Sequence, residues 1–155
     1  MAHIVAPLAT HPELPVFFNV NGVVGAAPAE NRREDVLLVQ YLFKMIADKP
    51  PALMTSEQRA IMRAVNMTGT CDQATINAIR LVQSKKKEKN PSVVVGGRVS
   101  PARSGYSYSG GAVWTIAVIN DLAQDMNTDV WPRIDLAQGC PPELAQMVKR
   151  QVVGV

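Results

Sequence analysis

Histidine and cysteine are the residues that most often support catalysis or metal binding, and both are scarce in this chain. The two histidines, His3 and His11, lie in a Pro- and Ala-rich N-terminal segment. A hydrolytic zinc site needs three protein ligands, and Ser-His-Asp or Cys-His catalysis needs a positioned histidine. Cys71 and Cys140 are far apart and form no CxxC pair, and their spacing leaves one disulfide open. In a reducing cytosol we expect two free, buried thiols. We therefore predict no metal site and no cofactor.

Two carboxylate pairs are the remaining candidates for catalysis, because glycoside cleavage uses paired acids. Glu34 and Asp35 fall in the first turn of an expected helix, where acids stabilise the positive end of the helix dipole. Asp121 and Asp125 are four residues apart, which is typical of a solvated helix face. The chain also lacks the glycine-rich loops that hold phosphates. We interpret both pairs as structural and expect a protein that is not an enzyme; a cell-wall hydrolase with an unrecognised site stays as a third hypothesis.

The strongest candidate for ligand binding is the Gly-, Ser- and Tyr-rich segment that begins at Arg98. Arg98 and Arg103 can hold carboxylates, and Tyr106 and Tyr108 can stack on sugar rings. Loops also carry function more often than helices do. The alternative interpretation, to which we give more weight, is that both tyrosines fold over the core with their hydroxyl groups at its rim.

Charge and hydropathy exclude two classes of partner. The net charge of the 155-residue chain is +3, and much of the excess comes from residues 85–89, which include no aromatic residue. Nucleic-acid binders normally combine a broader basic stripe with aromatics, so we interpret this run as the solvated end of a helix. No stretch approaches the roughly 20 apolar residues that cross a bilayer. We expect neither nucleic-acid binding nor membrane insertion.

The beginning of the chain does not resemble a Sec signal peptide. It lacks a basic start, and Pro7, Pro12 and Pro15 interrupt any apolar run. We expect the protein to be cytoplasmic as synthesised. If its ligand lies outside the cell, export to the periplasm or beyond must follow a non-Sec route.

Capping residues and apolar spacing predict a mainly α-helical protein. The expected helices cover residues 32–48, 56–65, 73–87 and 112–126, and a last one begins at residue 141. The expected caps are Asn31 with Glu34, Thr55 with Gln58, and Asp72. Before the first helix, Asn21-Gly22 indicates a short β-hairpin, and residues 93–95 form a β-type run.

Five residues within and between these helices are suited to structural roles. Thr75 falls in the first turn of its helix, where its hydroxyl can bond neighbouring backbone groups. Ala78 is small enough for another helix to approach closely. Gln40 and Gln83 interrupt apolar faces, and buried amides usually satisfy the backbone groups of loops. Gly69 supplies backbone freedom to the turn before the third helix.

Three stretches are similar to the signatures of one family. Residues 34–42, EDVLLVQYL, are similar to the opening pattern, which is roughly E-D-V-x-x-L-Q-x-x-L. Residues 69–83, GTCDQATINAIRLVQ, are similar to the second pattern, roughly G-x-F-G-x-x-T-x-x-A-V-x-x-F-Q, with Cys71, Asp72 and Val82 in place of its F, G and F. Residues 97–101, GRVSP, resemble the closing turn. These signatures belong to the peptidoglycan-binding-like domain family. The matched structural residues are Asp35, Gln40, Gly69, Thr75, Ala78 and Gln83.

The resemblance implies an orthogonal helical bundle of the peptidoglycan-binding-like type over residues 32–101. We expect a single domain, in which residues 1–31 form an extended segment with the hairpin and residues 102–155 add two C-terminal helices. The implied function is a non-catalytic module that binds peptidoglycan, the bacterial cell wall, in association with a secretion or phage-like apparatus. The alternative is an intracellular adaptor that keeps the scaffold but binds a protein partner; residues 50–65, which replace a short turn of the family, favour it. The oligomeric state stays open.

Overall fold

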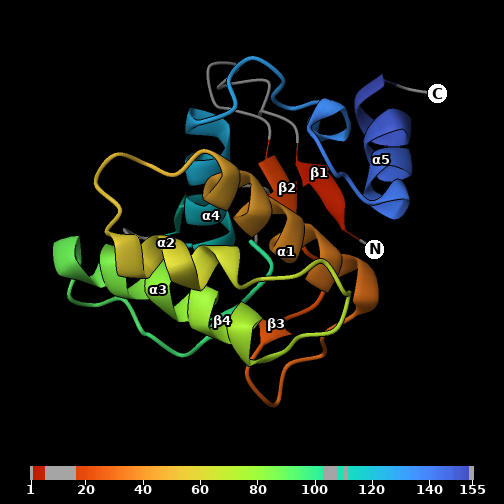
Figure 1. Ribbon diagram of the computed structural model, residues 1–155. Helices are drawn as coiled ribbons and strands as arrows, with labels where there is room; N and C mark the ends of the chain where they lie inside the picture. Colours follow the sequence, from red (N-terminus) through yellow and green to blue (C-terminus); the bar gives the residue numbers. More distant parts are fainter. Residues whose placement is uncertain (1, 6–16, 103–107, 110–111, 154–155) are drawn as a thin grey trace.

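The computed structural model describes residues 2–5, 17–102, 108–109 and 112–153, and this part of the chain is mainly helical, as the sequence predicts (Figure 1). Its α-helices are α1 (Arg33–Asp48), α2 (Ser56–Arg63), α3 (Gln73–Lys89), α4 (Thr115–Asp125) and α5 (Pro142–Val148). A 3₁₀ turn, η1 (Ile134–Leu136), precedes α5, and a π-helical segment, η2 (Lys149–Val153), extends it. None of the helices in the described residues has the length and hydropathy of a membrane span.

Short antiparallel ribbons of two strands join distant parts of the chain. β1 (His3–Val5) pairs with β2 (Phe17–Asn19), β3 (Val24–Gly25) with β4 (Arg98–Val99), and β5 (Tyr108–Ser109) with β6 (Ala112–Val113). In the second ribbon Val24 lies opposite Val99 and Gly25 opposite Arg98. This ribbon therefore ties the segment before α1 to the segment after α3.

The hairpin expected at Asn21-Gly22 does not form, and this prediction is wrong. The strands on either side, β2 and β3, belong to different ribbons. A two-residue hairpin of this composition needs positive φ at both central residues, and neither has it. Their backbone N–H groups instead donate to the two carboxylate oxygens of Asp35, at 3.1 and 2.9 Å. The bend is therefore held by a side chain of α1 and not by a strand partner.

Helix α1 is the central helix, as its apolar residues on several sides predict (Figure 1). The side chains of Tyr41 and Phe43 are fully buried. The Tyr41 hydroxyl lies 3.2 Å from the carbonyl oxygen of Ile134 and 3.3 Å from that of Gln138, so it holds the η1 loop against α1. The core thus continues from α1 into the C-terminal part of the chain.

The expected cap of α1 is wrong, whereas those of α2 and α3 are confirmed. Arg32 occupies the N-cap position of α1 without a side-chain bond. Asn31, at φ 50°, exchanges two hydrogen bonds with the backbone of Gly25 instead. Thr55 forms the expected capping box at α2, and Asp72 accepts from the backbone N–H of the third residue of α3. Asn31 departs from its expected role because its amide completes the bend after β3.

Two further expectations between α3 and α4 are wrong. Residues 93–95 form no strand, because the available partner, β3, pairs with residues 98 and 99. Val93 instead bonds back to Asn90 in a turn, and Val94 is 77% exposed. Helix α4 begins at Thr115 rather than at residue 112, because Ala112–Val113 is the strand β6.

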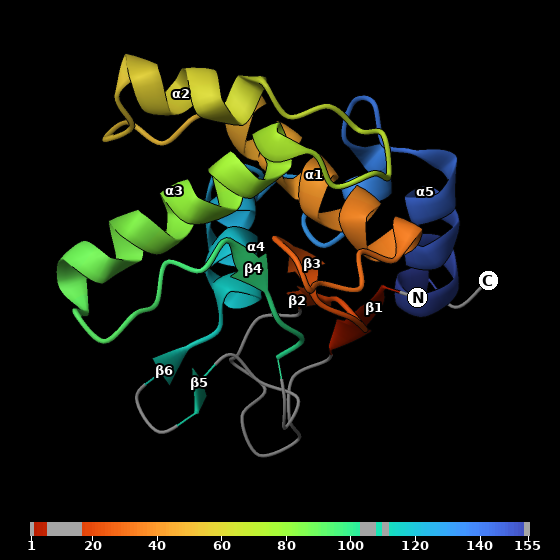
Figure 2. The same ribbon diagram turned by 90° about the horizontal axis from the view of Figure 1, so that it is seen from below.

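One hydrophobic core runs through the described chain. Its buried members come from β2, α1, α3, α4 and α5, and include Phe18, Leu42, Ile79, Ile119 and Leu144. Figure 2 shows α2 on one side of α1 and α4 with the β1–β2 ribbon on the other side, with α5 beside them. Trp114 and Trp131 pack against this core, as expected, and the rings of Phe18 and Trp131 meet edge to face at 5.2 Å. The segment after residue 101 therefore shares its core with α1 and α3.

Candidate functional site

The Gln40 amide fixes the turn that leads into α3. Its Oε1 accepts from the backbone N–H groups of Thr68 and Gly69, at 3.0 and 2.9 Å. Its Nε2 donates to the carbonyl oxygen of Thr70 at 3.0 Å and to the hydroxyl of Thr75 at 3.1 Å. Gly69 takes φ 76°, the backbone conformation for which glycine is suited. The fully buried amide of α1 therefore satisfies a whole turn, as the sequence predicts.

Thr75 couples this turn to the first turn of α3. Its hydroxyl donates to Asp72 at 2.8 Å, while its backbone N–H donates to the same carboxylate oxygen at 3.0 Å. These two bonds, the side-chain bond first, hold the pKa of Asp72 below its usual value. Ala78, one turn further along, is fully buried. The bond between Gln40 and Thr75 thus links α1 directly to the first turn of α3.

The Gln83 amide holds a second turn, the one between α3 and β4. Its Oε1 accepts from the N–H of Gly97 at 2.9 Å, and its Nε2 donates to the carbonyl oxygen of Arg98 at 2.9 Å. The same Nε2 also donates to the hydroxyl of Thr115, at 3.2 Å, at the start of α4. Gln83 is buried, so these bonds place the backbone of Arg98 rigidly.

Two arginines lie on the outer side of this clamped turn. Arg80 and Arg98 are both exposed. A Cβ atom built on Gly97 would lie 2.9 Å from Nε of Arg80, so the Arg80 side chain covers Gly97, next to Arg98. Neither guanidinium forms an ion pair within the described part of the chain. We call Arg80, Gly97 and Arg98 the α3–β4 face; it can bind carboxylates because guanidinium groups pair with them in a planar, charge-assisted manner.

The other residues of the predicted ligand site are only partly placed. Arg103 and Tyr106 lie outside the described residues, and Tyr108 is placed only as a residue of β5. Their interpretation as sugar-stacking or carboxylate-binding groups therefore remains a prediction. Sequence reasoning missed Arg80, although its position three residues before Gln83 on α3 was a usable signal.

The groups that most often support catalysis are dispersed. His3 lies in β1, and His11 lies outside the described residues. Among the described residues no three His, Cys, Asp or Glu side chains gather in a way that could hold a metal ion. The free thiols of Cys71 and Cys140 are half-buried, and burial raises the pKa of Cys140 to about 11 and also raises that of Cys71. Neither thiol is therefore activated as a nucleophile, which requires a lowered pKa.

The two predicted carboxylate pairs differ in their surroundings. Asp35 is fully buried and holds residues 21 and 22, as described above, while Glu34 lines a pocket beside it. Asp121 and Asp125 lie on the exposed side of α4. The pKa of Asp121 is raised, first by partial desolvation and then by the charge of Asp125. Both arrangements have a structural explanation.

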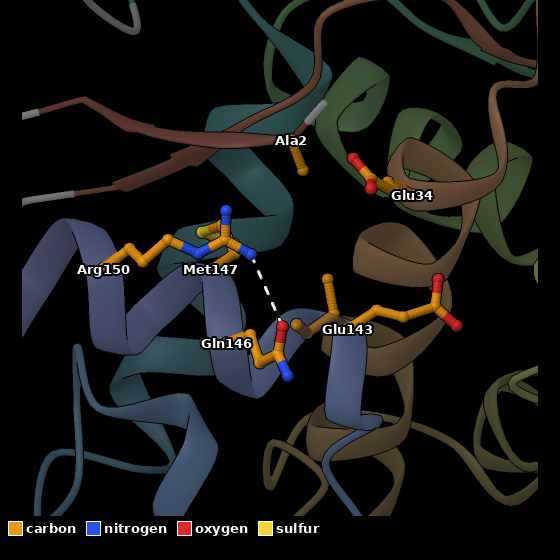
Figure 3. Close-up of a pocket in the computed structure, with 7 residues that line it drawn as sticks. Ala2, Glu34, Glu143, Gln146, Met147 and Arg150 are labelled. Atoms are coloured by element: carbon orange, nitrogen blue, oxygen red, sulfur yellow. Dashed lines mark hydrogen bonds between the residues drawn. The ribbon is translucent and has the colours of Figure 1, made fainter. Parts of the chain in front are cut away.

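A small pocket lies where α5 meets the start of α1 (Figure 3). The pocket is lined by apolar side chains together with Glu34, Glu143, Gln146 and Arg150. The Arg150 guanidinium donates a hydrogen bond to the amide oxygen of Gln146 at 3.4 Å. Arg33 pairs with Glu143 at 3.1 Å. The volume is about 100 Å³. Ligand pockets usually have volumes of at least about 300 Å³, so this pocket is a weaker candidate than the α3–β4 face.

No family model matches the chain, and neither the curated proteins nor the solved structures contain a match to it. The resemblance to the peptidoglycan-binding-like family therefore rests on the motif residues themselves.

Proposed function

We propose that the protein is a non-catalytic module of the peptidoglycan-binding-like type that binds the bacterial cell wall through the α3–β4 face. The observation that carries this proposal is the Gln83 clamp, which fixes the turn at Gly97 and Arg98. Arg80 of α3 covers Gly97 in this turn, and neither arginine has a carboxylate partner in the described chain. Peptide stems of peptidoglycan carry carboxylates, which are ligands for such guanidinium groups. A fixed site loses less conformational entropy on binding than a mobile loop would.

The matched residues of the resemblance support the same proposal. Gln40, Thr75 and Gln83 bond to one another or to the turns that flank α3. Such a scaffold holds loops and breaks no bonds, which agrees with a binding module. Tyr106 and Tyr108 are proposed to add stacking contacts with sugar rings. A secretion or phage-like apparatus is the proposed route by which the chain reaches the wall.

A pull-down with purified, insoluble peptidoglycan tests this function. We expect retention of the wild-type protein above an unrelated control protein. The double variant Arg80→Gln/Arg98→Gln should weaken retention by about tenfold, because two charge-assisted contacts are lost. The matched control, Arg32→Gln/Arg63→Gln, removes two exposed arginines elsewhere and should bind like the wild type. Retention equal to that of the control protein would exclude the proposal.

One observation favours a second candidate, a protein-interaction adaptor. Helix α2, which the family lacks, forms an open apolar groove of about 330 Å³ with α3, and this groove is lined by Ala60, Ile61, Ala64, Ala74 and Asn77. Small side chains let the helix of a partner approach closely. Co-purification from the native host with light scattering tests this candidate. Ala64→Asp should abolish recovery of a partner, whereas Ala52→Asp, in the exposed loop before α2, should not.

A further inference from the structure

A second surface, at the C-terminal end of α3, combines positive charge with exposed aliphatic side chains. Helix α3 ends in the lysine cluster, defined here as Lys85, Lys87 and Lys89, and all three side chains are exposed. None of them forms an ion pair within the described residues. The cluster therefore presents uncompensated positive charge at the negative end of the helix dipole.

The acidic residues near the cluster reduce this charge only in part. Glu88 lies within the run, and Glu57 lies in the first turn of α2, which packs along α3. Asp121 of α4 faces Lys86, the one half-buried lysine of the run. Burial raises the pKa of Asp121, and the charge of Lys86 offsets this rise only in part. Because Asp121 lies beside Lys86, the three exposed lysines stay available to an external anion.

The two most exposed large apolar side chains of the described chain belong to loops at this same end. Leu53, in the α1–α2 loop, is 89% exposed, and Val94, in the α3–β4 loop, is 77% exposed. Figures 1 and 2 show both loops and the C-terminal end of α3 at one end of the molecule, with the loops on either side of the helix end. A single exposed leucine is ordinary. Two exposed aliphatic tips that flank a lysine cluster form an amphipathic end.

We infer that this end docks on an anionic lipid surface, with the lysine cluster against the headgroups and Leu53 and Val94 at the boundary with the acyl chains. Basic groups beside a surface of anionic lipid bind it electrostatically, and aliphatic tips gain by leaving water. A nucleic acid fits less well, because single strands bind through stacking on aromatic rings. The described Phe, Tyr41 and Trp side chains are buried or packed against the core. This inference does not rest on wall binding, because it uses Lys85, Lys87 and Lys89 with two loop residues and none of the residues of the α3–β4 face.

Co-sedimentation with lipid vesicles tests the inference. The full chain is mixed with vesicles of phosphatidylcholine alone, or with one third of phosphatidylglycerol, at low and at rising salt. We expect binding to the anionic vesicles only, and a loss of binding as salt screens the charges. Lys85→Gln/Lys87→Gln/Lys89→Gln should weaken binding by about tenfold or more. Leu53→Ser/Val94→Ser should weaken it by about threefold to tenfold at constant charge.

Matched controls separate this surface from general charge and stickiness. Arg63→Gln/Lys149→Gln/Arg150→Gln removes the same number of exposed cations elsewhere, and Leu136→Ser removes an apolar side chain that is 62% exposed in η1. Both should bind like the wild type. The inference would be overturned if the protein bound neutral vesicles as well as anionic ones, or if the control variants lost as much binding as the test variants. Tighter binding to single-stranded DNA than to anionic vesicles would also overturn it. Retention on peptidoglycan without vesicle binding would overturn it and leave wall binding intact.

Discussion

At the scale of single residues, buried amides substitute for missing backbone partners. Asn120 accepts from the N–H of Phe18 at 2.7 Å and donates to its carbonyl oxygen at 2.8 Å, as a neighbouring strand would. In the same way, the Asn19 amide accepts from the N–H of Ala102 and donates to its carbonyl oxygen, both at 3.0 Å. A side-chain amide has one acceptor and two donors, so it can replace a peptide group. Strands of two or three residues are stable here because side chains complete their hydrogen bonding.

Replacement of Gln40 by leucine tests how much one such amide contributes. Gln40→Leu removes the partner of the buried Gly69 N–H, whereas the Thr68 N–H keeps the carbonyl oxygen of Asn66 and the Thr70 carbonyl group keeps the hydroxyl of Thr68. A buried group that loses its partner costs about 1–3 kcal/mol, so we expect the free energy of unfolding to fall by about 1–3 kcal/mol in urea titrations. The control, Gln73→Leu, loses one exposed hydrogen bond to Asn77 and should change the free energy of unfolding by less than about 0.5 kcal/mol.

The Cys140 thiol predicts a specific pH dependence. Burial, with the charge of Asp135, raises its pKa from 9.0 to about 11 in the folded protein. The folded state thus keeps a proton that the unfolded state releases, so the contribution to stability is complete below pH 9 and is lost as the pH rises toward 11. In the Cys71→Ala background, alkylation of the remaining thiol should follow an apparent pKa near 11 when native and near 9 in urea. Equal values in the two states would contradict the burial of Cys140.

At the scale of elements, caps and periodicity predict the helices well, because these signals are local. The Thr55 and Asp72 caps fix the starts of α2 and α3, and the proline at the first turn of α5 fixes its start. The ribbons could not be predicted, because their partners are distant: Gly25 pairs with Arg98, and Asn21-Gly22 is bent by Asp35. The roles of Gln40 and Gln83 could be predicted in kind, but not the particular turns they hold.

The turn between α3 and β4 offers a test of the site at the same scale. Gly97 has φ 73°, and an added Cβ would meet Arg80 and also lie 3.2 Å from Cγ2 of Ile76. Gly97→Ala should therefore lower the free energy of unfolding by about 1–2 kcal/mol and displace Arg80 from the α3–β4 face. Gly96→Ala is the matched control, because its nearest contact would be an ordinary 3.9 Å from Val94. Retention on peptidoglycan should fall with the first variant and stay unchanged with the second.

At the scale of the whole molecule, the three sequence segments form one packed body. Phe18 of the N-terminal segment, Leu42 of α1 and Ile116 of α4 belong to the same hydrophobic core. Polar contacts cross the same boundaries: Gln83 reaches Thr115, and Tyr41 reaches the η1 loop. The resemblance covers only the middle of these segments. A chain cut at residue 101 would leave apolar surface of α1 and β2 in water, at about 25 cal/mol for each Å².

A shared core predicts that the chain unfolds in a single cooperative transition. The two tryptophans, Trp114 and Trp131, both lie after residue 101, so tryptophan fluorescence reports on the C-terminal segment and its contact with Phe18. Far-UV circular dichroism is dominated by the longest helices, α1 and α3, which lie before it. Urea titrations followed by the two signals should therefore give the same midpoint and slope, since a two-state transition looks the same to every probe. If residues 32–101 were an independent bundle, the fluorescence and circular dichroism transitions would have different midpoints. Asn120→Leu, which breaks the link between α4 and β2, should move both curves together, because each part is stable only while the other is packed against it.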